Sequence, residues 1–99
     1  MNLDQEIARI FAPLNPRLVL LFGSRARGGA DESSDVDLIV VYQTDKRFLD
    51  RLDELYSRWD LPIAVDILAY TPAEFEEMKV RSGLVADAVE HGRIIVEAA

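Results

Sequence analysis

The segment "LFGSRARGGADESSDVDLIVV" (residues 21–41) joins two apolar runs through a polar stretch that contains glycine. The runs cover residues 17–22 and 36–42, and both are apolar on the two faces of a strand, which is typical of strands inside a sheet. Gly23 and Ser24 end the first run, whereas Asp35 and Asp37 open the second. Carboxylates at the mouth of a buried strand are costly to desolvate unless a positive group lies between them. Their position therefore indicates a function for both acids.

The composition limits the classes of protein to which the chain can belong. It has 99 residues, of which 49% are apolar, and this length predicts one domain over residues 1–99. The net charge of −7 argues against non-specific nucleic-acid binding, which needs clustered Lys and Arg. The absence of cysteine excludes disulfides and thiolate metal sites. No apolar run has the length of a signal peptide or a membrane span, so we expect a cytoplasmic protein that makes no membrane contact.

Apolar residues at steps of three and four predict a helix on each side of the quoted segment. The first covers residues 3–14, with Asn2 as its cap and prolines at its end. The second covers residues 48–59, with Thr44 or Asp45 as its cap, and Pro62 marks its end. The aromatic residues of this second helix, Trp59 among them, lie on its apolar stripe, and we expect them in the core.

The last third of the chain predicts a strand, a helix and a further short strand. Residues 63–70 form the third apolar run, and Thr71 and Glu74 have the spacing of a capping box. Gly83 is expected to break the helix that follows, Gly92 to end it, and residues 93–97 to add a strand. The predicted fold is α/β (α+β), with a small mixed central sheet flanked by helices.

Three aspartates interrupt the apolar strands and predict a metal site. Asp35 and Asp37 lie on the same face of one strand, roughly 7 Å apart, because alternate residues of a strand share a face. Asp66 joins them if its strand, residues 63–70, is the neighbour. Three carboxylates so close would raise one another's pKa, and a divalent cation removes that repulsion. Oxygen ligands without nearby His or Cys favour Mg²⁺ or Mn²⁺ over zinc.

A simpler alternative explains each acid separately. Asp35 would cap a turn, Asp37 would be solvated at a strand end, and Asp66 would pair with an arginine such as Arg17. This account is the better one for any single aspartate. The three together, facing a Gly-Ser turn, favour the metal site.

The Gly-Ser turn has the features of a phosphate-binding site. Gly23 allows a tight bend, and Ser24 offers a hydroxyl and an amide at the start of a short helical turn. Arg25 and Arg27 could reach phosphate oxygens as charged forks. The alternative is an ordinary turn followed by two solvated arginines. The Walker and dinucleotide-binding glycine patterns are absent, and His91 is expected at the surface near a helix end.

The combined pattern resembles a known enzyme superfamily. Gly23-Ser24, ten further residues and then Asp35-Val36-Asp37 are similar to the signature of the DNA polymerase β-like nucleotidyltransferases, and most of all to their smallest members, the minimal nucleotidyltransferases. Asp66 lies where these proteins have their third carboxylate. The resemblance covers nearly the whole chain and implies a polymerase β-like fold.

The resemblance also implies a reaction and a role for each residue. Asp35, Asp37 and Asp66 would bind two Mg²⁺ ions, and Asp66 would help to deprotonate the acceptor hydroxyl. Gly23 and Ser24 would hold the β- and γ-phosphates of ATP, with charge added by Arg25 or Arg27. AMP would pass to a hydroxyl group, and pyrophosphate would leave.

Minimal nucleotidyltransferases are commonly the antitoxins of two-gene systems in which the toxin is a HEPN-domain ribonuclease. The resemblance therefore implies that this chain adenylylates a tyrosine of a HEPN partner encoded by the adjacent gene. Two alternatives stay open. One is a binding module that neutralises the toxin by contact alone, and the other is a transferase that acts on a small molecule.

Overall fold

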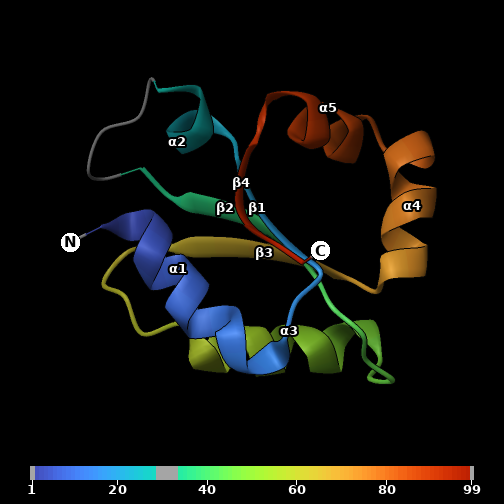
Figure 1. Ribbon diagram of the computed structural model, residues 1–99, viewed down its shortest axis with the longest axis horizontal. Coiled ribbons are helices and arrows are strands. Elements are labelled where there is room, and N and C mark those ends of the chain that lie inside the picture. The colour runs from blue at the N-terminus through green and yellow to red at the C-terminus, as the bar shows by residue number, and fades with distance from the viewer. Residues whose placement is uncertain (1, 29–33, 99) are drawn as a thin grey trace.

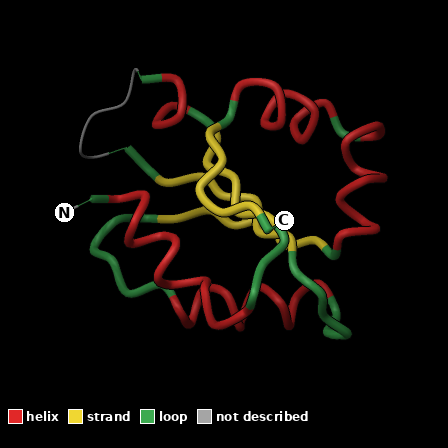
Figure 2. Tube along the Cα trace, in the orientation of Figure 1, coloured by secondary structure: helices red, strands yellow, loops and turns green. Residues whose placement is uncertain are grey.

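The computed structural model describes residues 2–28 and 34–98, which form one sheet covered by helices on both faces (Figures 1 and 2). The strands lie in the order β3-β2-β1-β4. Their bounds are β1 Leu18–Phe22, β2 Val36–Val41, β3 Val65–Tyr70 and β4 Arg93–Glu97. The helices are α1 Leu3–Phe11, a 3₁₀ turn Ala12–Leu14, α2 Ser24–Arg27, α3 Phe48–Arg58, α4 Pro72–Arg81 and α5 Gly83–His91.

The sheet is mixed, as the sequence predicts. β1 pairs antiparallel with both β2 and β4, whereas β2 and β3 run parallel and are joined through α3. β1 and β2 are therefore the inner strands, which explains why both are apolar on their two faces.

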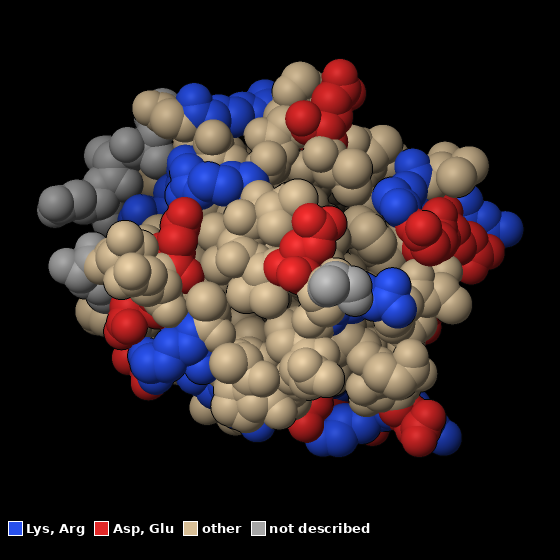
Figure 3. Space-filling model, viewed as in Figure 1, with Lys and Arg blue, Asp and Glu red and all other residues tan. Residues whose placement is uncertain are grey.

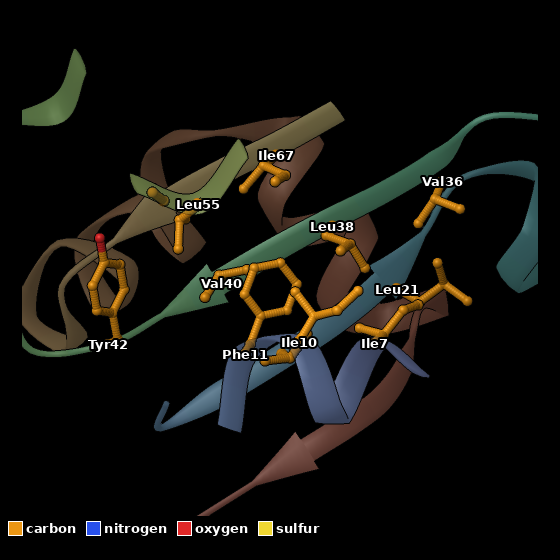
Figure 4. Packing of buried hydrophobic residues seen from close by; sticks show 12 residues of the cluster. Ile7, Ile10, Phe11, Leu21, Val36, Leu38, Val40, Tyr42, Leu55 and Ile67 are labelled. Carbon is orange, nitrogen blue, oxygen red and sulfur yellow. The ribbon is translucent and has the colours of Figure 1, made fainter. Parts of the chain in front are cut away.

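Each face of the sheet has its own apolar cluster. On one face α1 and α3 cover even-numbered residues of β2, and Ile7 and Phe11 of α1 are fully buried there (Figure 4). On the other face α4 and α5 cover Ile39 and Val41, with Val85 fully buried against them. Burying each large apolar side chain contributes about 1.5–3 kcal/mol, so these clusters hold the strand ends in fixed positions.

Several helix boundaries confirm the predicted start and stop signals. The Asn2 side chain accepts a hydrogen bond from the Gln5 amide at 3.0 Å and caps α1. Thr71 and Glu74 form both bonds of the capping box that opens α4. The helix predicted after residue 71 breaks before Gly83, where Ser82 caps α5. The final strand, β4, is present.

Other predicted boundaries are wrong by a few residues. α3 begins at Phe48 after Arg47, and neither Thr44 nor Asp45 caps it. The Thr44 hydroxyl instead accepts a bond from the Lys46 amide within a turn. α1 gives way to a 3₁₀ turn after residue 11, α3 ends at residue 58, and β3 begins at residue 65 rather than 63. These ends depend on tertiary packing, which local spacing does not encode.

Within the described ranges, none of the helices has the length and apolar character that crossing a membrane requires.

Candidate active site

Gly23 forms the tight turn between β1 and α2. Its φ of 76° and ψ of −156° lie in a region that only glycine adopts readily. A Cβ atom at this position would collide with Oδ2 of Asp37. The Asp37 carboxylate therefore lies directly against the backbone of the turn, and both the conformation and the close approach require glycine.

The strand register brings the aspartates to one face of the sheet. Asp37 lies opposite Phe22 of β1 on one side and opposite Asp66 of β3 on the other. Directly opposed residues in neighbouring strands point to the same face, so Asp37 and Asp66 are adjacent. Asp35 precedes Asp37 by two residues, immediately before β2, and is exposed like Asp66. The sequence predicted that Asp66 would join Asp35 and Asp37 if its strand lay beside theirs, and β3 is that neighbouring strand.

The carboxylates act on one another electrostatically. Burial raises the pKa of Asp37 above its ordinary value, and the nearby charges of Asp66 and Asp35 raise it further. Carboxylates held this close together give this end of the sheet a negative potential. A cation would be attracted to this end of the sheet.

A cleft of about 520 Å³ opens above Asp37 and Asp66. Its lining includes Gly23 of the turn, Tyr56 from α3, and Leu84 and Asp87 from α5. The cleft has the size of a small-molecule pocket and combines apolar walls with a few converging polar groups.

The carboxylate oxygens of the cleft suit a hard cation that binds together with a substrate. Among residues 2–28 and 34–98, no three His, Cys, Asp or Glu side chains are arranged to hold a metal ion by themselves. Mg²⁺ usually keeps several waters and is bound by one or two carboxylates together with substrate phosphates. A cleft with two adjacent aspartates and no thiol or imidazole in its lining suits that mode of binding.

The two arginines after the Gly-Ser turn have partners within the protein. Arg25 Nε donates to the Ser34 carbonyl at 2.7 Å and so links α2 to the start of β2. Arg27 Nη2 donates to Asp87 Oδ2 at 2.6 Å, which links α2 to α5 at the cleft. Both Arg27 and Asp87 are about half exposed. Arg25 is therefore more than a solvated side chain, whereas Arg27 remains at the surface.

The pairing of Asp66 with Arg17 is also wrong. The Arg17 amide donates to the Val41 carbonyl at 2.7 Å, at the end of β2 far from Asp37. Among the ion pairs of the described residues, none joins Asp66 to Arg17 or to another arginine. The simpler explanation thus fails for the third acid.

Sequence reasoning missed the cleft residues contributed by helices. Trp59 is partly buried and packs against the core, where it stacks on Phe11 with ring centroids 6.4 Å apart. The prediction is wrong for Phe48 and Tyr56 of α3, which are 42% and 40% exposed, and Tyr56 lines the cleft. Leu84 and Asp87 of α5 carried no motif, and only the packing of α5 beside the sheet brings them to the site. His91 is exposed in the last turn of α5, as predicted.

The surface charges are mixed on the side shown in Figure 3. The described Lys and Arg side chains there form separate groups, with Asp and Glu between them.

A comparison with protein families decides where the chain belongs. The family described as "Polymerase beta, Nucleotidyltransferase" matches residues 5–98. The chain is a member of this nucleotidyltransferase family. The match includes the Gly-Ser turn and the three predicted aspartates, Asp35, Asp37 and Asp66.

Individual relatives agree with this family. A protein of Haemophilus influenzae, described as "Probable protein adenylyltransferase MntA", is 44% identical over 64 residues. That match covers 61% of this chain and 56% of the relative, so it spans little more than half of the relative's length.

Two solved structures share the fold of this nucleotidyltransferase. A toxin–antitoxin with AMP-PNP superposes with a TM-score of 0.67 at 22% identity, and the match covers 99% of this chain and 75% of that one. A mutant MntA–HpeT toxin–antitoxin gives 0.65 at 19% identity, covering 96% and 73%.

Proposed function

We propose that this chain is a nucleotidyltransferase that moves AMP from ATP to a protein hydroxyl group. The observation that carries the proposal is the contact of the Asp37 carboxylate with the Gly23 turn, with Asp66 beside it in the neighbouring strand. A phosphate at the turn and a cation at the carboxylates would then be close to each other. Family membership and the described adenylyltransferase relative support the same reaction.

Each residue has a role that follows from its position. The backbone and hydroxyl of Ser24 at the start of α2 hold the β- and γ-phosphates, and Arg27 adds positive charge at the same turn. The acceptor oxygen attacks the α-phosphorus, and the bond from that phosphorus to the pyrophosphate oxygen breaks. Asp66 accepts the proton that the hydroxyl loses, and pyrophosphate leaves.

Asp35, Asp37 and Asp66 are the residues that would bind two Mg²⁺ ions. Bound Mg²⁺ would supply charge stabilisation to both the attacking and the leaving oxygens of this in-line displacement. Asp37 deprotonates more readily once a cation offsets its neighbours, because their charges raise its pKa. The contribution of the protein is to hold these acids on one face of adjacent strands.

The proposed acceptor is a tyrosine of a HEPN-domain toxin, which the reaction would silence. Support comes from the relative described as a protein adenylyltransferase and from the two toxin–antitoxin structures that share the fold. The cleft is open at the surface, and this suits an acceptor delivered by a partner protein.

The test uses ATP labelled at the α-phosphate, with Mg²⁺ and the HEPN-domain protein encoded next to this chain. Label should pass to the partner, and its ribonuclease activity should fall. The double variant Asp35→Ala, Asp37→Ala should transfer no label, whereas the control Asp50→Ala, Asp53→Ala removes two exposed acids of α3 and should transfer normally.

The outcomes separate the alternatives. Undiminished labelling by the Asp35, Asp37 double variant would refute the assigned roles. Toxin neutralisation by that variant without labelling would favour a binding module. Labelling of a small hydroxyl compound in place of the protein would favour the small-molecule transferase.

A further inference from the structure

The free edge of β3 is held by side chains of α3. β3 is an outer strand of the sheet. In its parallel pairing with β2, the backbone N–H and C=O groups of every second residue point to β2, as the hydrogen bonds accepted by the Ala64 and Tyr70 carbonyls show. The N–H and C=O groups of Val65, Ile67 and Ala69 consequently point outward. Such an unpaired edge frays or attracts other strands unless something covers it.

Two of these outward groups have partners on α3. The hydroxyl of Tyr56 accepts a hydrogen bond from the Ile67 amide at 2.9 Å. Arg51 Nη1 donates to the Ala69 carbonyl at 3.5 Å. The edge is thus fixed at two points, and the first is the residue that follows Asp66.

Tyr56 is placed where this bond affects the cleft. It lines the cleft together with Asp37 and Asp66, and it is 40% exposed, unlike the buried Leu55 beside it in the sequence. Asp66 itself lies opposite Asp37 in the register with β2. The strand around Asp66 is therefore held by β2 on its inner side and, one residue later, by Tyr56 on its outer side.

We propose that Tyr56 is a positioning residue that fixes the direction of the Asp66 carboxylate by holding the Ile67 amide. The inference rests on the proposed function, which gives Asp66 its role in metal binding and proton acceptance. A reacting group works only when it is held within a fraction of an ångström, and a fraying edge strand would not supply that precision. The Tyr56 hydroxyl supplies the missing outer contact.

The decisive variant is Tyr56→Phe, which removes the hydroxyl and keeps the ring. Tyr70→Phe is the matched control, because Tyr70 lies on the same strand and its hydroxyl has no hydrogen-bond partner among the described residues. The first measurement is amide hydrogen exchange in the nucleotide-free protein. Tyr56→Phe should speed the exchange of the Ile67 amide by about fivefold, the effect of one lost hydrogen bond, and Tyr70→Phe should leave it unchanged.

The second measurement is binding of Mn²⁺ to the protein in the presence of saturating AMP-PNP, by calorimetry, because substrate phosphates complete the coordination of such a cation. The affinity for Mn²⁺ should fall by about threefold in Tyr56→Phe and by more in Asp66→Asn. Turning the Asp66 carboxylate away from the metal costs less affinity than removing it. The third is steady-state transfer, in which kcat should fall by about three- to tenfold while KM for Mg²⁺-ATP changes by less than about twofold.

The possible results are distinguishable. Faster Ile67 exchange with unchanged Mn²⁺ affinity and unchanged kcat would mean that Tyr56 only covers the edge, and the inference would be overturned. A raised KM with unchanged kcat would assign the ring to nucleotide binding and would also overturn it. If the wild-type protein transfers no AMP, the proposed function fails, and the exchange and Mn²⁺ measurements still decide the role of Tyr56.

Discussion

Gly23 and Asp37 are coupled through direct contact. The carboxylate lies where a side chain at position 23 would begin, so any other residue there must displace it. The same glycine also has a backbone conformation that costs other residues roughly 1–3 kcal/mol. One position thus controls both the shape of the turn and the location of an acid in the cleft.

Gly23→Ala should damage both stability and activity. We expect about 2–4 kcal/mol of destabilisation in urea unfolding, from backbone strain plus displacement of Asp37. Gly28→Ala is the control, because Gly28 also has positive φ, at 80°, but a Cβ there meets nothing within 4 Å. Gly28→Ala should cost about 1 kcal/mol and preserve transfer. Equal losses in the two variants would show that the contact with Asp37 is unimportant.

Asp37 is expected to lower the stability of the metal-free protein. Its pKa is raised in the folded state, first by burial and then by Asp66 and Asp35, so the folded protein binds this proton more tightly than the unfolded chain does. Stability is therefore lost as pH rises through the pKa of folded Asp37. The site is maintained at a cost in stability, as is common where function requires like charges to be close.

Asp37→Asn should stabilise the protein and abolish transfer. Without metal at neutral pH, the melting temperature should rise by about 4–8 °C for a gain of about 1 kcal/mol. The gain should vanish below about pH 4, where Asp37 is protonated in both states. The exposed residue Asp53 supplies the control, Asp53→Asn, which changes the charge equally and should not raise the melting temperature. A lower melting temperature for Asp37→Asn would contradict the argument.

At the scale of helices, α2 and α5 meet through the ion pair between Arg27 and Asp87. This pair is exposed, and exposed ion pairs contribute at most about 1 kcal/mol. A polyphosphate offers a guanidinium more charge than one carboxylate does. Nucleotide binding should therefore draw Arg27 away from Asp87, which acts as its partner in the nucleotide-free protein.

Asp87→Asn should strengthen nucleotide binding. It removes a negative charge from the cleft and releases Arg27, so the Kd for Mg²⁺-AMP-PNP should fall by about two- to fivefold, as measured by calorimetry. The comparable exposed pair of Arg9 and Asp60, at 2.9 Å, lies outside the cleft and gives the control Asp60→Asn. Weaker binding by Asp87→Asn would instead assign this carboxylate to the metal or the nucleotide.

A second ion pair joins α3 to α4 at the other end of β3. Arg51 is buried, and it binds both carboxylate oxygens of Glu74, at 2.6 and 3.2 Å, and the Lys46 carbonyl at 2.8 Å. Glu74 also belongs to the capping box, and the pKa of its carboxyl is lowered, first by the Arg51 hydrogen bond. This ion pair therefore connects the beginning of α3 to the beginning of α4 at the end of β3 that lies away from the cleft.

Arg51→Ala should destabilise the protein by about 2–4 kcal/mol in urea unfolding, because it leaves Glu74 and two carbonyls without their donor. Arg9→Ala, which breaks only exposed pairs, should cost less than about 1 kcal/mol. A similar cost for the two variants would mean that burial of Arg51 adds nothing.

At the scale of the whole molecule, the ligand and the fold are linked by mass action. A nucleotide that binds only the folded protein adds about 2.7 kcal/mol at about a hundred times its Kd. Millimolar Mg²⁺-AMP-PNP should therefore raise the melting temperature by several degrees. The Asp35→Ala, Asp37→Ala variant should not respond. No shift in the wild-type protein would contradict the proposed site.

Local signals in the sequence predicted the parts of the fold that depend on neighbouring residues. The capping box at Thr71, the break before Gly83 and the acids at the start of β2 are all readable within a few residues. The contribution of Tyr56 and the pairing of Arg27 with Asp87 join segments far apart in the chain. Their contacts arise only when helices pack beside the sheet, so spacing alone could not predict them.

The position of β4 has a consequence for how the protein is made in the cell. β1 pairs with β4, whose residues are synthesised about seventy positions later, and the Leu20 and Leu21 partners on β4 are Ile94 and Arg93. A ribosome-bound nascent chain can pair β1 with β2 early, yet one side of β1 remains open until translation passes residue 97. The sheet is thus completed only after β4 has been made.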